Sequence, residues 1–357
     1  MADSTAAASS PPPPAPAGAA ATAPDPQQQP EIDVDPDFQD DDADSALGDD
    51  NASSTASVSS SIFEYRKIHG RTFHNFGQAK EEYWAPNDET QNEQLDINHH
   101  LLTLALNDRL YLAPLENPKK VLDIGTGTGI WAIDFADGFP NAEVIGTDLS
   151  PIQPVWVPPN CKFQLDDASQ VPWTFHDNSL DYVHIRYMIG CFKDWQSVYR
   201  EAYRVLKPGG WLEHMECSSS VLSDDGSLPE DSIFSDWKKL FKEAGAKMGQ
   251  TFEIIDDDKW VGWLKEAGFA HVNQKTIKAP VGEWPKDKRM KQVGQFNQYS
   301  LTMGIEGFGL FVLTTVLGWE YNKVQVFMAK MKEALRNRDY HSYVIWGVAW
   351  TQKPFDA

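Results

Sequence analysis

The sequence predicts an α/β protein with a Rossmann-like sheet, in which buried parallel strands alternate with helices. Residues 120–124 are a short aliphatic run, as expected for a strand that is buried on both faces. A glycine-rich loop follows, and from Ile130 apolar residues recur at helical spacing until Gly138. Residues 142–147 are then typical of a second strand, which ends at Asp148. Together these features indicate a strand, loop, helix and strand unit.

The loop after the first strand indicates a nucleoside-containing cofactor. Its glycines, Gly125, Gly127 and Gly129, allow a tight turn and let backbone N–H groups approach a ligand. The dinucleotide fingerprint G-x-G-x-x-G would need a glycine at Ile130, which disfavours an NAD-dependent enzyme. The chain instead has D-x-G-x-G-x-G from Asp123, which suits S-adenosylmethionine because that cofactor has no pyrophosphate. A bare turn without a ligand is the structural alternative.

Acidic residues stand at the ends of the predicted strands. Asp123 is placed to meet the ammonium group of the cofactor's amino-acid tail, directly or through water. Asp148 is placed to accept hydrogen bonds from both ribose hydroxyls, as the acid does in dinucleotide folds. A third strand at 161–166 ends in Asp166-Asp167-Ala168, where Asp167 could accept from the adenine amino group. Paired loop acids are otherwise often helix caps.

The rest of the chain continues the alternation of strands and helices. Ligands bind beyond the carboxyl ends of parallel strands, so the end of the fourth strand should border the reacting centre. That end includes His184, Arg186, Tyr187 and Met188. Lys207-Pro208-Gly209-Gly210 predicts a helix stop and a turn into the fifth strand. In chain order we predict a strand at 180–186, a helix at 194–206, a strand at 211–217, helices at 232–248 and 259–267, and strands at 269–281 and 343–351.

A helical segment before the first strand is expected to lie across the cofactor pocket. Residues 93–112 have apolar side chains at helical spacing. This helix contains His99 and His100. Either one of them faces the pocket, as a base or a cofactor contact, or both lie on an ordinary helix face.

An apolar and aromatic insert occupies residues 282–342, before the last strand. It is either a lid over the substrate or a packed hydrophobic helix. Its most apolar run resembles a membrane span. We reject that interpretation because the run is short, contains Glu306 and is interrupted by Gly304, Gly307 and Gly309.

The N-terminal 61 residues differ in composition from the rest. Residues 1–65 contain no Lys or Arg and thirteen acids, nine of them Asp between Asp33 and Asp50. With almost no aliphatic content, residues 1–61 predict a disordered acidic tail of low complexity. The pattern of a signal peptide is absent. The tail is either an interaction arm or simply solvated.

Charge and cysteine content limit the partners and the compartment. The formal net charge is −21, and beyond residue 65 there are 39 acids against 31 bases, which argues against a nucleic-acid partner. Cys161, Cys191 and Cys217 are widely spaced, without a C-x-x-C, so we expect no zinc site or disulfide framework. A reducing compartment follows, with the cytoplasm expected and the nucleus as the alternative. No basic cluster forms an obvious nuclear signal.

These motifs together resemble class I S-adenosylmethionine-dependent methyltransferases. Within them the chain is similar to the fungal LaeA-like, or trans-aconitate-methyltransferase-like, group. The resemblance lies in VLDIGTGTGIWAIDFAD, VIGTDLSPIQP, the aspartates after the third strand and LKPGGWLEHME. Upstream, HGRTFHNF, YWAPNDE and LDINHH resemble the lead-in of the same group, so the similarity runs from about His69 to the C-terminus. The chain departs from the group in having Trp84-Ala85-Pro86 where an aliphatic-Pro pair is usual, at the pocket roof.

The resemblance implies a seven-stranded sheet with the last strand antiparallel, and S-adenosyl-L-methionine as cofactor. It implies one methyltransferase domain at 62–357, comprising a helical lead-in at 62–118, a cofactor-binding core at 119–281, a helical insert at 282–342 and the last strand at 343–354. His99 corresponds to the group's lead-in histidine. The implied cofactor residues are Asp123, Gly125, Thr126, Gly127 and Gly129 for the methionine side, Asp148 and Leu149 for ribose, and Asp167 and Ala168 for adenine.

The expected activity is in-line methyl transfer to a small-molecule acceptor in fungal secondary metabolism. A hydroxyl or carboxylic acid acceptor would need a base, for which His99 or His184 are candidates, whereas a thiol or amine would need less help. No catalytic residue is assigned. The alternative is a regulatory protein with a methyltransferase fold that acts in the nucleus with a velvet-type partner. Hydrolase and metalloenzyme functions are disfavoured because no matching constellation of residues is evident.

Overall fold

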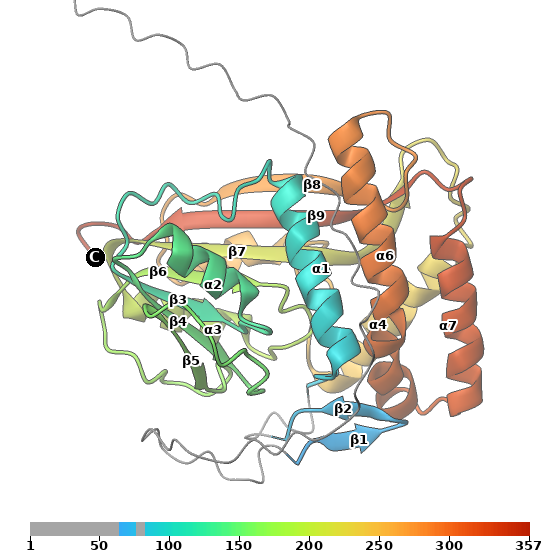
Figure 1. Cartoon of the computed structure of the whole chain (residues 1–357), viewed down its shortest axis with the longest axis horizontal. Helices are drawn as coiled ribbons and strands as arrows, with labels where there is room; N and C mark the ends of the chain where they lie inside the picture. The colour runs from blue at the N-terminus through green and yellow to red at the C-terminus, as the bar shows by residue number, and fades with distance from the viewer. Residues whose placement is uncertain (1–63, 76–82) are drawn as a thin grey trace, which may run out of the picture. The chain divides into compact units, whose positions relative to one another are not determined.

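The computed structural model describes residues 64–75 and 83–357 (Figure 1). The acidic segment 1–61 and its boundary with the following domain lie outside the described residues. The division of 62–357 into lead-in, core, insert and last strand therefore stays a prediction, although most of its elements can be located.

A seven-stranded mixed sheet has the order β5-β4-β3-β6-β7-β9-β8. Strands β5, β4, β3, β6 and β7 are parallel to their neighbours in that series. Strand β9 is antiparallel to both β7 and β8, which confirms the reversed last strand. The strands are β3 (Lys120–Ile124), β4 (Glu143–Asp148), β5 (Cys161–Leu165), β6 (Leu180–Arg186), β7 (Leu206–Ser223), β8 (Asn273–Pro280) and β9 (Ser342–Gln352).

Helices cover both faces of the parallel half of the sheet. Helix α2 (Ile130–Gly138) packs on one face, where Val121 of β3 shares a hydrophobic cluster with Trp131. Helices α3 (Trp195–Val205) and α5 (Lys259–Glu266) cover the other face, where Leu122 of β3 shares a hydrophobic cluster with residues of both helices. Burial on both faces explains why Val121, Leu122 and Ile124 of β3 are all aliphatic.

The segment before the sheet forms a short hairpin and then a helix. The hairpin, β1 (Arg66–Ile68) with β2 (Arg71–Phe73), has no assigned counterpart in the sequence-based prediction. Helix α1 (Glu89–Ala105) begins and ends earlier than the predicted 93–112. It begins at Glu89 because Asp88 caps its N-terminus by accepting from the Gln91 N–H.

The insert is helical, as predicted, and packs beside α1. It contains α6 (Lys288–Phe311), a π-helical turn (Val312–Val316) and α7 (Tyr321–Leu335), and α4 (Ile233–Met248) lies against the same cluster. Figure 1 shows α1 and α6 side by side, with α7 on the far side of α6.

Glycines allow the close packing of α6 and do not interrupt it. A Cβ on Gly304 would lie 2.9 Å from Gln94 Cγ of α1, and one on Gly309 would lie 2.1 Å from Met328 Cε of α7. The expectation that these glycines break the apolar run was therefore wrong. They permit neighbouring helices to approach the α6 backbone.

The apolar helix is also longer than expected. Residues Lys288–Val316 form one helix of 29 residues, with a mean hydropathy of 1.3 in its most apolar window, so length and composition alone would allow a membrane span. However, 56% of that window is buried inside the protein, as in a core helix. The predicted shortness was wrong, and burial is the feature that favours the packed-helix interpretation.

Strand β7 begins directly after α3, without the predicted turn. The Gly209 N–H donates to the Lys353 carbonyl oxygen, and the Lys353 N–H donates to the Gly210 carbonyl oxygen. This pairing with the segment after β9 extends the strand through Lys207-Pro208-Gly209-Gly210, with an irregular register against β6.

Candidate functional site

A cavity of about 470 Å³ lies beyond the carboxyl ends of β3, β4, β5 and β6. Strand β3 has β4 on one side and β6 on the other, so this is the point where the strand order reverses, and ligands of open α/β sheets bind there. Tyr83 and residues of helix α1 also line the cavity. Eight of the nine predicted cofactor residues line the cavity: Asp123, Gly125, Thr126, Gly127, Asp148, Leu149, Asp167 and Ala168.

Two glycines of the loop have different structural roles. Gly125 lines the cavity at φ +66°, and a Cβ there would lie 2.1 Å from Met188 Sδ. Gly129, the ninth predicted residue, does not line the cavity and precedes α2 at φ +81°. Its Cβ would lie 2.3 Å from the Phe163 ring, so glycine is needed there for packing. A cofactor contact of Gly129 stays a prediction.

Asp148 fixes the glycine loop to the end of β4. Its Oδ2 accepts from the Gly127 N–H at 2.8 Å, and its Oδ1 accepts from the Ser150 N–H at 2.9 Å. Burial raises the pKa of this carboxyl to about 6. Each oxygen keeps a lone pair beyond its backbone bond, so Asp148 can still accept from ribose hydroxyls.

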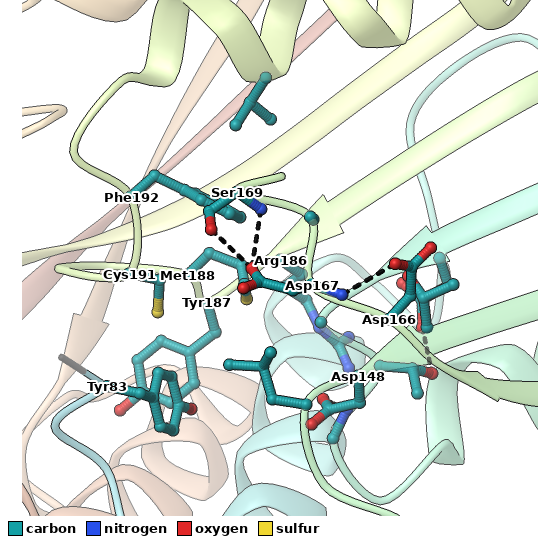
Figure 2. A pocket seen from close by; sticks show the side chains of 18 of the residues that line it. Tyr83, Asp148, Asp166, Asp167, Ser169, Arg186, Tyr187, Met188, Cys191 and Phe192 are labelled. Atoms are coloured by element: carbon teal, nitrogen blue, oxygen red, sulfur yellow. Dashed lines mark hydrogen bonds between the residues drawn. The ribbon is translucent and has the colours of Figure 1, made fainter. Parts of the chain in front are cut away.

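Asp167 presents an unpartnered acceptor to the cavity. Its Oδ1 accepts from the N–H and the hydroxyl of Ser169, at 3.0 and 2.6 Å. Its Oδ2 is buried and has no hydrogen-bond partner among the described residues. Figure 2 shows Asp167 bonded to Ser169, with Asp166 to its right and Tyr83, Cys191 and Met188 to its left. A buried oxygen without a partner fits a ligand that supplies a donor, such as an adenine amino group.

Asp123 is held within the protein at the end of β3. Its Oδ1 accepts from His184 Nδ1 at 2.7 Å, and its Oδ2 accepts from the Thr126 hydroxyl at 2.6 Å. The His184 ring stacks on Trp131 at 3.6 Å between centroids. Burial lowers the pKa of His184 to about 4, so its ring is neutral at neutral pH. Asp123 thus anchors the loop, and any ligand contact uses its remaining lone pairs.

His99 is likewise engaged with other side chains. The Arg186 guanidinium donates to His99 Nδ1 at 3.0 Å, which leaves the proton on Nε2, 2.9 Å from Asp134 Oδ2. Burial, together with the charge of Arg186, lowers the pKa of His99 to about 3. Neither His99 nor His184 lines the cavity. This geometry disfavours either histidine as the catalytic base, and the catalytic residue stays unassigned.

The second histidine of α1 lies away from the cavity. His100 is exposed and packs edge-on against Phe296 of α6, with 4.6 Å between ring centroids. It therefore occupies an ordinary helix face.

Several lining residues were missed in the sequence. Tyr83 immediately precedes Trp84-Ala85-Pro86, which the family resemblance placed at the pocket roof, whereas nothing in its local sequence marks Gln250. Asn98 had a detectable signal, because it shares the apolar face of α1 with Leu95 and Leu102. Arg186, Tyr187 and Met188, expected to border the reacting centre, do line the cavity.

The described residues contain no cluster of three or more His, Cys, Asp or Glu side chains suited to a metal ion. Cys161, Cys191 and Cys217 are free. The strand order, the positive-φ glycine loop and the strand-end carboxylates define a Rossmann-like protein with a site for a nucleoside-containing cofactor.

Comparison with known proteins identifies the family. A family described as a methyltransferase domain matches residues 97–274. The chain is 41% identical over 309 residues to methyltransferase pytC of Aspergillus terreus, covering 86% of this chain and 93% of that protein. It is 35% identical over 280 residues to secondary metabolism regulator LAE1 of Cochliobolus heterostrophus, covering 77% and 90%. It is 31% identical over 292 residues to protein-methionine methyltransferase laeA of Emericella nidulans, covering 82% and 77%.

The chain therefore belongs to the class I S-adenosyl-L-methionine-dependent methyltransferases, in the fungal LaeA-like group. It is an enzyme of the transferase class, and S-adenosyl-L-methionine is its methyl donor. This excludes the NAD-dependent alternative.

Proposed function

We propose that this chain transfers the methyl group of S-adenosyl-L-methionine to a small-molecule acceptor in fungal secondary metabolism. The observation that supports this most directly is that the end of β6, with Arg186, Tyr187 and Met188, lines the same cavity as the glycine loop. Tyr83, and Asn98 from α1, line it as well. A cavity walled by the lead-in suits a small acceptor, and the relative pytC is named a methyltransferase.

The residues of the cavity fit the cofactor. Asp148 would accept from the ribose hydroxyls, and the free Oδ2 of Asp167 would accept from the adenine amino group. Arg186 would bind the carboxylate of the methionine portion, because burial lowers its pKa only to about 10 and it stays charged at neutral pH. Leu149 and Ala168 would pack against the ribose and the adenine. The bound cofactor supplies a methyl group that is already activated on a sulfonium.

The protein residues supply alignment and exclusion of water. His99 and His184 do not line the cavity, and burial lowers their pKa values to about 3 and about 4, which makes both weak bases, so neither is expected to remove a proton from the acceptor. An acceptor that loses a proton would pass it to water. The site therefore favours an acceptor whose nucleophilic atom needs little assistance.

The test is transfer of a labelled methyl group. Purified protein is incubated with S-adenosyl-L-methionine labelled with ¹³C in the methyl group and with low-molecular-weight fractions of fungal cultures. We expect label in a small molecule, and its loss in Asp167→Asn. The Asn oxygen can keep the Ser169 bonds, which turns an NH₂ group towards the adenine amino group. Absence of label in every small-molecule fraction contradicts the proposal.

A second candidate function is methylation of a protein methionine. Met188 Sδ lies against Gly125 in the cofactor cavity, and the Emericella nidulans relative is named a protein-methionine methyltransferase. Methylation of a thioether forms a sulfonium and releases no proton, which suits a cavity without a free base. In the same incubation, peptide mass spectrometry would find the label on Met188, and Met188→Leu would remove it. Label elsewhere in the protein, or none, contradicts this candidate.

The regulatory alternative, with a velvet-type partner in the nucleus, remains a prediction. The Cochliobolus heterostrophus relative is named a secondary metabolism regulator. For a stand-alone enzyme in the cytoplasm, a tagged chain purified from a fungal host should come without a stoichiometric partner. Recovery of an equimolar velvet-type protein would favour the regulatory function instead.

A further inference from the structure

A second cavity adjoins the cofactor cavity. It has a volume of about 90 Å³ and shares Asn98 and Tyr187 with the first cavity as lining residues. Its other walls come from α4, α6 and α7 and from strands β7 and β9. Helices of the insert thus form a pocket beside the cofactor site, which no motif in the sequence had marked.

We propose that this second cavity binds the methyl acceptor and selects an uncharged, largely apolar molecule that carries a hydrogen-bond-accepting oxygen. The inference rests on the proposed function, because the acceptor must lie beside the methyl donor. It adds the chemical class of the substrate.

The residues that line the second cavity disfavour a charged ligand. The described lining residues of the second cavity include no Asp, Glu, Lys, Arg or His. Trp84 lines it and is fixed by donating Nε1–H to the Ile189 carbonyl oxygen at 3.0 Å. Its ring lies 5.5 Å from Phe252 and 6.3 Å from Phe308, in edge-on contacts. A charged acceptor would lose its hydration here without a compensating partner, whereas an aromatic or aliphatic group would be stabilised.

Two polar groups in this wall lack partners. The Trp346 indole N–H and the Ser219 hydroxyl are buried and make no hydrogen bond among the described residues. The side chain of Trp346 is only 3% exposed. An indole N–H can only donate, so the group that satisfies it must be an acceptor such as a carbonyl, ether or hydroxyl oxygen. This requires an oxygen on the otherwise apolar ligand.

The junction of the two cavities has a strained residue. Tyr187 has φ +59°, a left-handed conformation that is uncommon outside glycine and is often retained at functional sites. Its hydroxyl is hydrogen-bonded to Gln94, which donates to the Ser300 hydroxyl of α6 at 2.8 Å. The insert thus fixes Tyr187 between the cofactor and the acceptor. The nucleophilic atom of the acceptor would lie at this junction, between Tyr187 and Asn98.

The size of the cavity limits what fits inside it. A cavity of about 150 Å³ holds benzene, and this one is smaller, at about 90 Å³. It therefore encloses an alkyl group or the edge of one ring, and the rest of the acceptor extends into the cofactor cavity. Small monocyclic probes are the appropriate test ligands.

The test compares two matched probes by saturation-transfer difference NMR on protein saturated with S-adenosylhomocysteine. The probe 4-methylphenol is uncharged, and 4-hydroxybenzoate replaces its methyl group with a carboxylate. We expect signal transfer to 4-methylphenol and little to 4-hydroxybenzoate. Equal transfer to both probes would overturn the inference.

Variants locate the binding. Ser219→Leu fills the cavity and should abolish 4-methylphenol binding, whereas the matched Ser219→Ala removes only the hydroxyl and should weaken binding by no more than the loss of one hydrogen bond. Trp346→Phe keeps an aromatic ring but removes the donor and should weaken binding about 5- to 10-fold, the effect of one hydrogen bond. Unchanged binding by Ser219→Leu would contradict the assignment.

Calorimetric titration of S-adenosylhomocysteine separates failure of the acceptor site from failure of the proposed function. Unchanged cofactor affinity shows that Ser219→Leu is folded. Cofactor binding without 4-methylphenol binding by the wild type would refute the acceptor site and leave the proposed function intact. Binding of 4-methylphenol to a folded chain without cofactor affinity would support the pocket and refute the proposed function.

Discussion

Protonation of Asp148 should make cofactor binding depend on pH. Burial raises the pKa of its carboxyl to about 6, so it is ionised at pH 7.5 and becomes protonated as the pH falls through 6. The charged form accepts on both oxygens, whereas the protonated form turns one oxygen into a donor. Affinity for S-adenosylhomocysteine should therefore decrease as the pH falls from 7.5 to 5. Calorimetric titration across this range measures the decrease.

The control for this prediction is Asp148→Asn, which cannot titrate. Its affinity should be lower at pH 7.5 and should change little down to pH 5. A wild-type affinity that stays constant, or that rises as the pH falls, would show that Asp148 does not accept from the cofactor.

His99 provides a prediction that separates a positioning role from catalysis. His99→Gln removes the Nδ1 acceptor of Arg186 and should lower the free energy of unfolding by about 1–3 kcal/mol, because a half-buried guanidinium loses a partner. Urea unfolding measures the loss. The pH dependence of methyl transfer should keep its shape, since the imidazole is neutral throughout. Loss of an ionisation step from the pH profile would restore His99 as a base.

Residues at strand ends could be predicted from the sequence, and their partners could not. Asp148 and Asp167 follow predicted strands, and that position alone placed them at the cavity. The states of His99 and His184 depend on Arg186 and Asp123, which are distant in the chain. Without those partners, a histidine near a cofactor motif is easily mistaken for a base.

At the scale of elements, glycine packing positions α6 against α1. Gly304→Ala places a Cβ 2.6 Å from Phe308 Cζ and 2.9 Å from Gln94 Cγ, so it should destabilise the fold by about 1–3 kcal/mol. The matched control is Gly262→Ala in α5, where a Cβ meets nothing within 4 Å. That change should stabilise by about 0.5–1 kcal/mol, because alanine favours helix. Denaturant unfolding of both variants gives the comparison.

The two alanine substitutions should change the free energy of unfolding in opposite directions. If both alanine variants raised the free energy of unfolding, α6 would not need to approach α1 closely at Gly304. The packing at Gly304 would then not determine the shape of the second cavity between α1 and α6.

Elements with a strong local period were predictable, and elements defined by tertiary contacts were not. Strands β3 and β6 are short segments rich in buried aliphatic and aromatic residues, and they were placed at their observed residues. The β1–β2 hairpin is polar and three residues long on each side, so no local period marks it. In α6, glycines that serve helix packing were mistaken for breaks, which concealed a continuous helix of 29 residues.

For the whole molecule, the sheet topology could be expected only from the resemblance to a family. The first strand, glycine loop and second strand are one local unit, and they specify a cofactor class on their own. The antiparallel β9 pairs with β7 across more than a hundred residues and with β8 across more than sixty, and no local pattern encodes that pairing. The second cavity arises from α1, α4, the insert, β7 and β9, which explains why its chemistry could not be inferred before the fold.

We expect the glycine loop after β3 to bind the cofactor. The direct test is calorimetric titration of S-adenosylhomocysteine into the wild type, Gly127→Trp and the control Gly138→Trp. Gly127 has φ +58° and lines the cavity, so an indole there would occupy it, whereas Gly138 is exposed and a Cβ there meets nothing within 4 Å.

We expect one binding site per chain in the wild type and in Gly138→Trp, and no measurable binding in Gly127→Trp, with circular dichroism showing that all three are folded. A folded wild type that does not bind, or a Gly127→Trp variant that binds as tightly as the wild type, would contradict the account.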